Sequence, residues 1–300
     1  IHMKSKKPKY SSFLQKDYEP AKAENAAFHV IQAPYEDNIS YGEGTSKGPA
    51  AIIAASQYLE IFGAKSEPAL RGIHTVPALN CKGSPEKVLH RISCAVKKAL
   101  ESSAVPVLLG GEHTVSYGMA KALFEKYGRD FGIIHFDSHG DLRPEYYGNR
   151  FSHACVMRRI VEDFQIPLMQ IGTRAYCMKE SKYRIKNGIS SIDADRIING
   201  GIPKKIIPRS FPKKVFISFD VDVLDPSIMP STGTPEPGGL LWNDVIKILS
   251  SVSRQVRIIA FDLVELAPIP SMHHADYTVA KLAYFMMQLC PEGKSDGRTR

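Results

Sequence analysis

Histidines and acidic residues stand directly behind four apolar segments of this 300-residue chain. The four groups read Gly-Gly-Glu-His (110–113), Asp-Ser-His-Gly-Asp (137–141), Asp-Val-Asp (220–222) and Asp-Leu-Val-Glu (262–265). Any one of them alone is typical of a turn with helix-capping residues. Four carboxylates buried side by side would raise one another's pKa and destabilise the fold unless cations neutralised them. If the groups meet in the fold, they therefore predict a metal site.

The types of the candidate ligands indicate which metal would bind. Four carboxylates and two imidazoles form the set: His113, Asp137, His139, Asp141, Asp220 and Asp222. Carboxylate-rich coordination favours manganese over structural zinc, with Zn, Co and Ni left as alternatives. Four carboxylates balance two divalent ions, and two ions about 3.5–4 Å apart would make a bridging water nucleophilic near neutral pH. The predicted chemistry is metal-assisted hydrolysis at an sp² carbon or at phosphorus.

A parallel α/β fold would bring these groups together. Short apolar segments alternate with amphipathic ones, which predicts one domain with a parallel sheet covered by helices on both faces. The predicted strands are Phe28–Ile31, Val105–Leu109, Phe131–Phe136, Leu168–Ile171, Lys214–Phe219 and Val256–Phe261. The predicted helices are Pro49–Phe62, one starting at Ser84-Pro85, Val115–Tyr127, His153–Phe164, Leu240–Val252 and Tyr277–Cys290. Right-handed crossovers place the loop after every strand at the same sheet edge.

Composition and charge exclude several other classes of protein. With 43% hydrophobic and 23% charged residues the chain is typical of a globular protein. It contains no apolar run of ~18 residues that would span a membrane, and no secretory signal at its start. Five cysteines without a paired motif indicate a reduced, cytoplasmic protein with neither disulfides nor a thiolate zinc site.

The net charge of +8 is concentrated at the two ends of the chain. Lysines between residues 4 and 9 supply +4 and residues 292–300 add +1, so the body carries only +3. That distribution argues against a nucleic-acid partner. We expect a basic tail at 1–10, with Ile1-His2 as an expression remnant ahead of Met3, then one domain at 11–291 and a flexible tail at 292–300.

Five motifs in the same order resemble those of the ureohydrolases, the arginase/agmatinase family. Besides 110–113, 137–141 and 262–265, they are Ser-Phe-Asp-Val-Asp-Val-Leu-Asp-Pro (218–226) and Gly-Thr-Pro-Glu-Pro-Gly-Gly-Leu (233–240). The resemblance spans roughly Val30 to Cys290. It implies a three-layer α/β/α fold of the arginase type, two Mn²⁺ per chain, and hydrolysis of a guanidino group to urea and an amine. It also implies a homo-oligomer, either a trimer or a hexamer.

The resemblance also assigns roles to individual residues. His113 and Asp141 would bind one manganese ion, His139 and Asp222 the other, and Asp137 and Asp220 would bridge both. His153 matches the histidine that moves protons at the mouth of the cleft, and otherwise would be a surface histidine at a helix start. Glu265 matches the acid that pairs with the guanidinium, where a carboxylate accepts two parallel N–H bonds; otherwise it would be a buried cap. His153, Glu265 and Asp141 are the expected catalytic residues, and Glu265 and His153 also bind substrate.

The segment at 142–152 separates subclasses within the family. It resembles agmatinases, as does the segment at 40–49, and differs from the arginase loop that grips an α-amino acid. We therefore expect hydrolysis of agmatine to putrescine and urea, a step of polyamine biosynthesis. Guanidinobutyrase, aminopropylagmatine ureohydrolase and arginase are the alternatives within the family.

Two alternatives come from other functional classes. A metallophosphoesterase would share Asp137 and His139, but the chain has no later Gly-Asn-His-Asp/Glu element. A catalytically silent metal-binding homologue would not be expected to keep every ligand together with His153 and Glu265. Outside the motifs, His135 is expected to be a core histidine or a neighbour of the ligands. His273-His274 is expected in a loop before the last helix, and Trp242 in the core.

Overall fold

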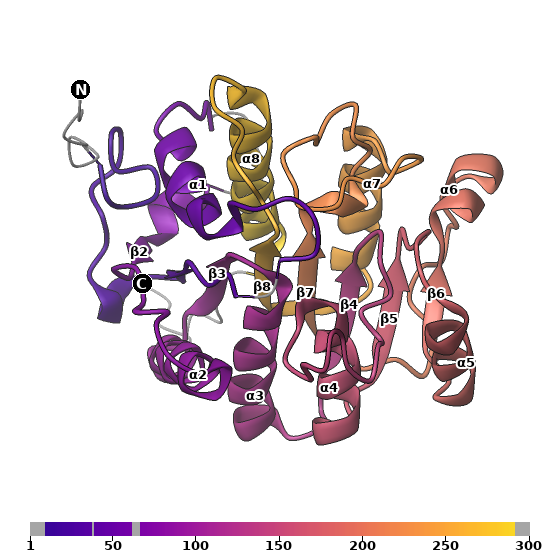
Figure 1. Ribbon diagram of the computed structural model, residues 1–300. Helices are drawn as coiled ribbons and strands as arrows, with labels where there is room; N and C mark the ends of the chain where they lie inside the picture. The colour runs from indigo at the N-terminus through magenta and orange to yellow at the C-terminus, as the bar shows by residue number, and fades with distance from the viewer. Residues whose placement is uncertain (1–9, 38, 62–66, 292–300) are drawn as a thin grey trace.

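The computed structural model describes residues 10–37, 39–61 and 67–291, and at their centre is an eight-stranded sheet between two layers of helices (Figure 1). Every pair of neighbouring strands is parallel. In sheet order the strands are β2 (Ile73–Thr75), β1 (Phe28–Ala33), β3 (Val105–Gly110), β8 (Arg257–Val264), β7 (Lys214–Asp220), β4 (Gly132–Phe136), β5 (Leu168–Ile171) and β6 (Ser190–Ile192). The predicted parallel sheet with helices on both faces is confirmed.

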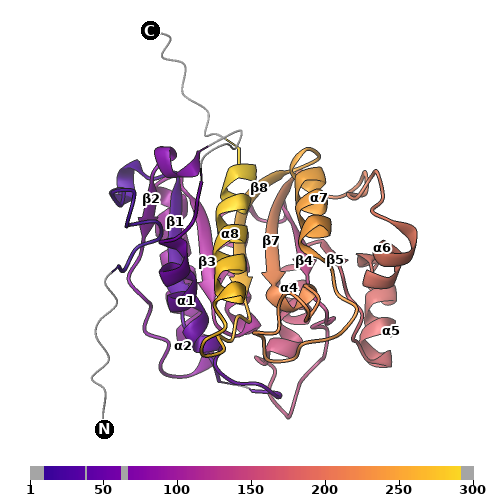
Figure 2. The ribbon, with the colours of Figure 1, turned by 90° about the horizontal axis from the view of Figure 1, so that it is seen from above.

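The helices bury two apolar cores, one on each face of the sheet. One face carries α1 (Gly48–Ser56), α7 (Trp242–Ser253) and α8 (His273–Leu289), which form the layer nearest the viewer in Figure 2. The other face carries α2 (Pro85–Glu101), α3 (Ser116–Tyr127) and α4 (Val156–Phe164). Two short helices, α5 (Met178–Lys186) and α6 (Ala194–Gly200), lie beside the edge strand β6 (Figure 1). Short 3-10 turns occur at Ala23–Asn25, Thr45–Lys47, Pro68–Arg71, His113–Val115, His153–Cys155 and Val221–Val223.

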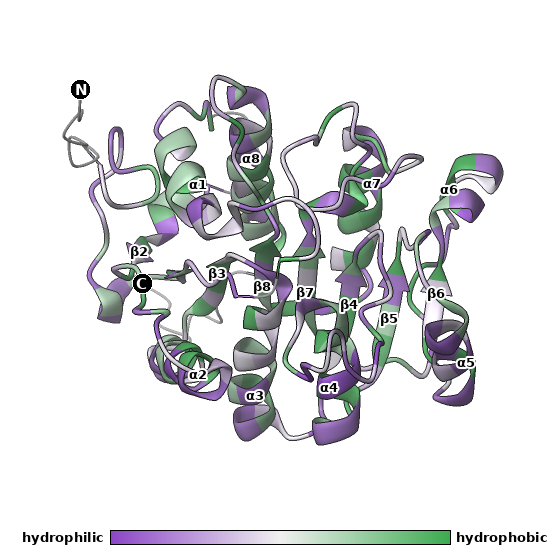
Figure 3. Cartoon of the chain, in the orientation of Figure 1, coloured by the Kyte–Doolittle hydropathy of each residue, from purple (hydrophilic) through white to green (hydrophobic). Residues whose placement is uncertain are grey.

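Four elements were not among those that the sequence predicts. The edge strands β2 and β6 have three residues each, too few for an apolar run, and α5 is largely hydrophilic (Figure 3). The short helix α6 offers only seven residues. Helix periodicity and strand hydrophobicity are weak signals over such lengths. The central strands carry the strong apolar signal, and all six of the predicted strands are present.

Two predicted positions are wrong, and a third is met only in part. The first helix ends at Ser56 rather than at residue 62, which lies outside the described residues. The N-terminal segment contacts this end of the helix, where Leu14 N donates to Ser56 Oγ (3.0 Å). His273 and His274 begin α8 instead of lying in a loop. Trp242 packs against the core but is only partly buried.

The two predicted tails, at 1–10 and 292–300, fall almost entirely outside the described residues, which begin at residue 10 and end at residue 291. Within the described part of the chain, no helix is long and apolar enough to cross a bilayer.

The turn after β3 packs directly against the segment that follows β1. Gly111 N donates to Ala33 O (2.9 Å), and Glu112 N donates to Tyr35 O (2.8 Å). A Cβ atom on Gly111 would lie 2.0 Å from Tyr35 O, which is backbone and cannot rotate away. Only glycine therefore fits at this point, and the close contact fixes where His113 enters the sheet edge.

We expect Gly111→Ala to destabilise the protein by about 1–3 kcal/mol, the usual range for overpacking, because the two backbones must separate. Gly200→Ala is the matched control, since a Cβ at Gly200 meets nothing within 4 Å. Denaturant unfolding of both variants measures the difference. Equal free energies of unfolding for the Gly111 variant and the wild type would contradict this account of the turn.

Candidate metal centre

Four adjacent strands, β3, β8, β7 and β4, deliver the predicted site residues to one edge of the sheet. His113 follows β3, and the acids of 137–141 follow β4. Asp220 ends β7, Asp222 lies in the turn behind it, and Glu265 follows β8. Parallel strands in adjacent positions place these ends side by side. The structure thus gathers residues that are as much as 152 positions apart in the sequence.

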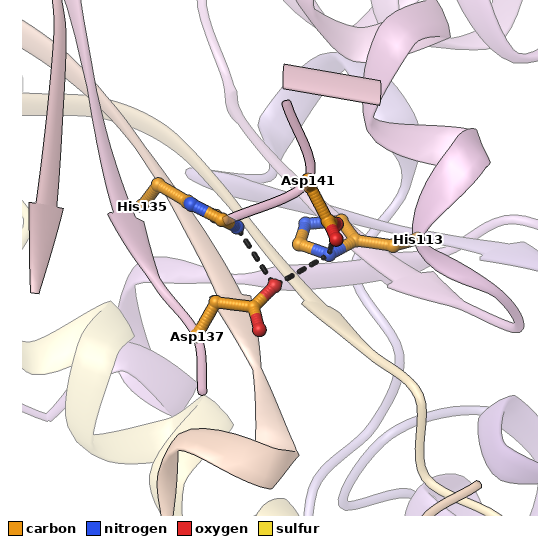
Figure 4. A group of neighbouring side chains, drawn as sticks. All are labelled: His113, His135, Asp137 and Asp141. Carbon is orange, nitrogen blue, oxygen red and sulfur yellow. Dashed lines mark hydrogen bonds and ion pairs between the residues drawn. The ribbon is translucent and has the colours of Figure 1, made fainter. Parts of the chain in front are cut away.

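The six candidate ligands lie within contact distance of one another. His113 Nδ1 is 3.0 Å from Asp141 Oδ2, 3.1 Å from Asp137 Oδ2 and 3.3 Å from Asp220 Oδ2. His139 Nδ1 is 2.8 Å from Asp222 Oδ2 and 3.5 Å from Asp137 Oδ1. Asp137 therefore turns one oxygen to each histidine. Figure 4 shows His113 and His135 converging on Asp137, with Asp141 beside them.

These side chains form two overlapping groups that could each hold a cation. One group is His113, His135, Asp137 and Asp141, and the other is Asp137, His139 and Asp222. Asp137 belongs to both. All of these side chains are buried except His139, whose side chain is 30% exposed and lines the cleft above.

The hydrogen bonds of His113 direct its Nδ1 toward the carboxylates of the cluster. Its Nε2 lies 2.9 Å from Ser218 Oγ, and that hydroxyl donates to Asp262 Oδ1 (3.0 Å), so Nε2–H is the donor to Ser218. Nδ1 is buried and faces three carboxylates at 3.0–3.3 Å. Burial alone would lower the pKa of His113, but Asp137, Asp141 and Asp220 raise it well above its usual range. A bound metal ion would replace the proton at Nδ1 and contact the carboxylates as well.

The electrostatics of the cluster also indicate missing positive charge. Burial, and then the nearby charges of Asp222 and Asp137, raise the pKa of Asp220 well above its usual range. Burial and Asp137 raise the pKa of Asp141 to about 6. Burial alone would lower the pKa of His139, but the carboxylates of Asp222 and Asp137 raise it to about 12. The cluster thus holds protons that bound cations would displace.

Asp137 behaves differently from its neighbours because donors surround it. Burial alone would raise its pKa, but His135, His113 and His139 lower it well below the usual range. Its Oδ1 also accepts a hydrogen bond from His139 N (2.5 Å). Asp137 is therefore the carboxylate that stays ionised at the centre of the cluster.

Two site residues have a strained backbone. Asp141 (φ 51°) and Glu265 (φ 65°) both adopt the left-handed conformation that non-glycine residues rarely populate. Glu265 is held there by two bonds to the turn after β3. Its N–H donates to Gly111 O (2.8 Å), and its Oε1 accepts from His113 N (2.6 Å). Burial, and then Glu112, raise the pKa of Glu265 well above normal.

A cleft of about 200 Å³ opens above the cluster, and His153 lies in its wall. His153 begins the 3-10 turn that leads into α4, and its Nε2 lies 2.7 Å from Ser40 Oγ. Its ring meets the edge of the Tyr146 ring at a centroid distance of 6.0 Å. Asp141, Asp220, Asp222 and Glu265 line the same cleft.

Arg174 is a site residue that the sequence analysis missed. Its guanidinium donates to Asp222 O (2.9 Å) and to Glu236 O (2.7 Å), so it ties the ligand turn behind β7 to the segment at 233–240. The available signal was its place directly behind the strand β5, in the loop Gly172-Thr173-Arg174. An arginine that binds backbone carbonyls, however, has no partner that can be recognised in the sequence.

Comparisons with known proteins bear on the whole chain. The model of the arginase family matches residues 26–290. An N(1)-aminopropylagmatine ureohydrolase from Thermus thermophilus is 37% identical over 89% of this chain and 91% of its own length. An agmatinase from Pyrococcus horikoshii is 31% identical over 88% and 92%.

Solved structures agree with these sequence matches. The agmatine ureohydrolase of Thermoplasma volcanium superposes with a TM-score of 0.83 at 27% identity, covering 93% of this chain and 94% of that one. The predicted arginase-type fold and the resemblance of the motifs are thereby confirmed. The chain belongs to the arginase family.

Proposed function

We propose that this protein is a cytoplasmic, homo-oligomeric ureohydrolase that uses two Mn²⁺ ions to hydrolyse agmatine to putrescine and urea. The observation that carries the proposal is the pair of overlapping ligand groups that share Asp137 at the base of the cleft. Carboxylate-rich groups of this kind suit manganese. Membership of the arginase family supports a guanidino group as the substrate's reacting part.

The residues of the cluster divide between two ions. His113 and Asp141 would hold one ion, His139 and Asp222 the other, and Asp137 with Asp220 would contact both. Two bound ions lower the pKa of a water enough to make it a nucleophile near neutral pH. Asp141 lines the cleft and contacts His113, and it would accept a proton from the nucleophile that the ions activate.

Glu265 and His153 would act on the substrate itself. Glu265 lines the cleft, and its carboxylate can accept two parallel N–H bonds from a guanidinium. Because Oε1 already accepts from His113 N, the carboxylate's direction is fixed before substrate arrives. His153 would hold a proton at Nε2, in contact with Ser40, and deliver it to the departing amine.

The charge of the cleft favours a substrate with a second cationic end. Seven acids line it: Glu36, Glu112, Asp141, Glu180, Asp220, Asp222 and Glu265. Arg143 is the one Lys or Arg among the described lining residues, and its guanidinium already stacks over the Tyr146 ring (5.1 Å) near Glu180 (3.9 Å). Two divalent ions would balance Asp137 and only three of the seven, Asp141, Asp220 and Asp222, so four lining acids would keep their charge. Agmatine suits this cleft better than arginine, whose α-carboxylate would find no free cation there.

N(1)-aminopropylagmatine is the second candidate substrate. The 37% identity to the Thermus thermophilus enzyme of that name favours it. Its additional amine would extend toward the outer wall, where Tyr41 is 84% exposed and lines the cleft. The same negative charge that suits agmatine suits this longer substrate.

The first prediction concerns the metal ligands. We expect Asp220→Asn to lose at least one Mn²⁺ and nearly all activity, because the change keeps the side-chain size but removes a charge between the two ions. Asp130→Asn, a change at a surface acid whose side chain is 72% exposed, is the matched control. Metal analysis of the purified variants decides the matter. Two tightly held Mn²⁺ in the Asp220 variant would refute the assignment.

The second prediction concerns His153. His153→Ala should keep both metals and most of its affinity for agmatine, while kcat falls about 10²–10⁴-fold, the usual contribution of a general acid–base residue. His90→Ala, at an exposed histidine on α2, should leave the kinetics unchanged. An unaltered kcat for the His153 variant would remove this residue from the mechanism.

The third prediction concerns substrate choice. Urea release should be greatest from agmatine or N(1)-aminopropylagmatine, with kcat/KM for arginine lower by up to ~10⁴-fold, because its carboxylate would be buried without a partner. Glu265→Gln should weaken hydrolysis of every guanidino substrate. A preference for arginine would show that the cleft charge does not set specificity.

Assaying these guanidino compounds together with a phosphate ester tests the two other functional classes. Hydrolysis of p-nitrophenyl phosphate without any urea release would favour a metallophosphoesterase. Two bound metals with no hydrolysis of any compound in the panel would favour a silent homologue.

A further inference from the structure

A row of polar side chains crosses four adjacent strands in the middle of the sheet, directly beneath the metal cluster. Strand register places Gln170 beside His135, His135 beside Ser218, and Ser218 beside Asp262. All four are fully buried. Buried polar groups on adjacent strands are costly unless each is satisfied. The Ser218–Asp262 half of the row forms hydrogen bonds that orient His113. The His135–Gln170 half has no role in the proposed function.

The His135–Gln170 half continues away from the metal cluster as a chain of hydrogen bonds. Gln170 Nε2 lies 3.0 Å from His135 Nδ1 and donates to Gly140 O (2.8 Å). Arg184 Nε on α5 donates to Gln170 Oε1 (3.0 Å). Arg184 Nη1 in turn contacts both carboxylate oxygens of Asp193 at 2.9 Å. The outer helix α5 is thus connected to the ligand loop behind β4.

The chain determines which nitrogen of His135 carries the proton. Arginine can only donate and a carbonyl can only accept, so the amide of Gln170 must turn its oxygen to Arg184 and its nitrogen to Gly140. The second amide hydrogen then points at His135 Nδ1, which must accept it. The ring proton of His135 therefore lies on Nε2, 2.8 Å from Asp137 Oδ2 (Figure 4).

This proton fixes the carboxylate at the centre of the cluster. Asp137 Oδ2 accepts from His135 Nε2–H, and Asp137 Oδ1 accepts from His139 N–H. With one donor on each oxygen the carboxylate cannot rotate, and each oxygen still faces a different histidine of the cluster. Because Nε2 carries a proton, it cannot also offer a lone pair to a metal, although His135 stands within ligand distance of the cluster.

We propose that His135 is a positioning residue for the metal centre, held in one tautomer by Gln170 and Arg184, and that it orients Asp137 between the two ions. The inference rests on the metal centre of the proposed function. Neighbours that orient metal ligands typically account for about 10–100-fold in metal affinity. The expected effect of losing the donor is therefore weaker Mn²⁺ binding.

The test is titration of the metal-free protein with Mn²⁺, followed by the electron paramagnetic resonance signal of the free ion, without substrate. His135→Leu should raise the Kd of at least one ion about 10–100-fold. His135→Gln should bind Mn²⁺ nearly as the wild type does, because the amide nitrogen of glutamine can replace Nε2–H. His29→Leu is the matched control, since His29 is also a buried strand histidine but bonds to Ala23 O (2.9 Å). It should leave the Kd unchanged.

Several results would overturn the proposal. Wild-type affinity in His135→Leu would show that the donor is not needed. Equal losses in His135→Gln and His135→Leu would make His135 a ligand or a packing residue. If His135→Leu does not fold, Arg184→Lys answers the same question, because lysine keeps the charge opposite Asp193 but loses the Nε donor to Gln170. Unchanged Mn²⁺ affinity in the Arg184 variant would contradict the proposal that Arg184 and Gln170 hold His135 in one tautomer.

The proposed function and the proposed positioning role of His135 can fail separately. A chain that releases no urea but shows the expected order of Mn²⁺ affinities would refute the ureohydrolase proposal and keep the role of His135. A chain that hydrolyses agmatine with unchanged Mn²⁺ affinity in every variant would do the reverse. A wild-type chain that binds no Mn²⁺ would refute both.

Discussion

Repulsion among buried carboxylates is the constraint on which the rest of this structure depends. An uncompensated buried charge costs several kcal/mol, and a whole domain is stable by only ~5–15 kcal/mol. Asp137, Asp141, Asp220 and Asp222 lie within contact distance of two histidines, and the pKa of Asp220 and Asp141 is raised. The fold therefore has to supply cations, hydrogen-bond donors, or both. It supplies a donor to each oxygen of Asp137 and one backbone donor each to Asp220 and Asp222, and it leaves the remaining charge for bound ions.

The architecture of the sheet makes this concentration of charge possible. Four adjacent parallel strands end at one edge, so residues from distant parts of the sequence meet there. The local geometry is demanding. Gly111 leaves no space for a Cβ, and Asp141 and Glu265 adopt left-handed backbone conformations. Strain of this kind persists where surrounding bonds fix it, and here the bonds between Glu265 and the turn after β3 do so.

The sequence predicted what local patterns encode and missed what only the strand order determines. Apolar runs located six of the eight strands, and the acids behind them located the cluster. The edge strands and α5 were too short or too polar for such patterns. Ser218 was noted only as the first residue of a motif, Arg174 was missed although it directly follows β5, and Gln170 could not be foreseen as part of the site. Gln170 matters because β5 pairs with β4 in a register that places it beside His135, and neither residue carries information about that register.

The two halves of the polar row end on opposite charges, and this explains why both are needed. The imidazole of His113 is backed by Ser218 and the carboxyl group of Asp262, which makes Nδ1 a better electron donor to a cation. The carboxylate of Asp137 is backed by His135, Gln170 and the guanidinium of Arg184, which reduces its negative charge. These hydrogen bonds thus make the neutral ligand, His113, a stronger electron donor and reduce the negative charge of the ionised ligand, Asp137.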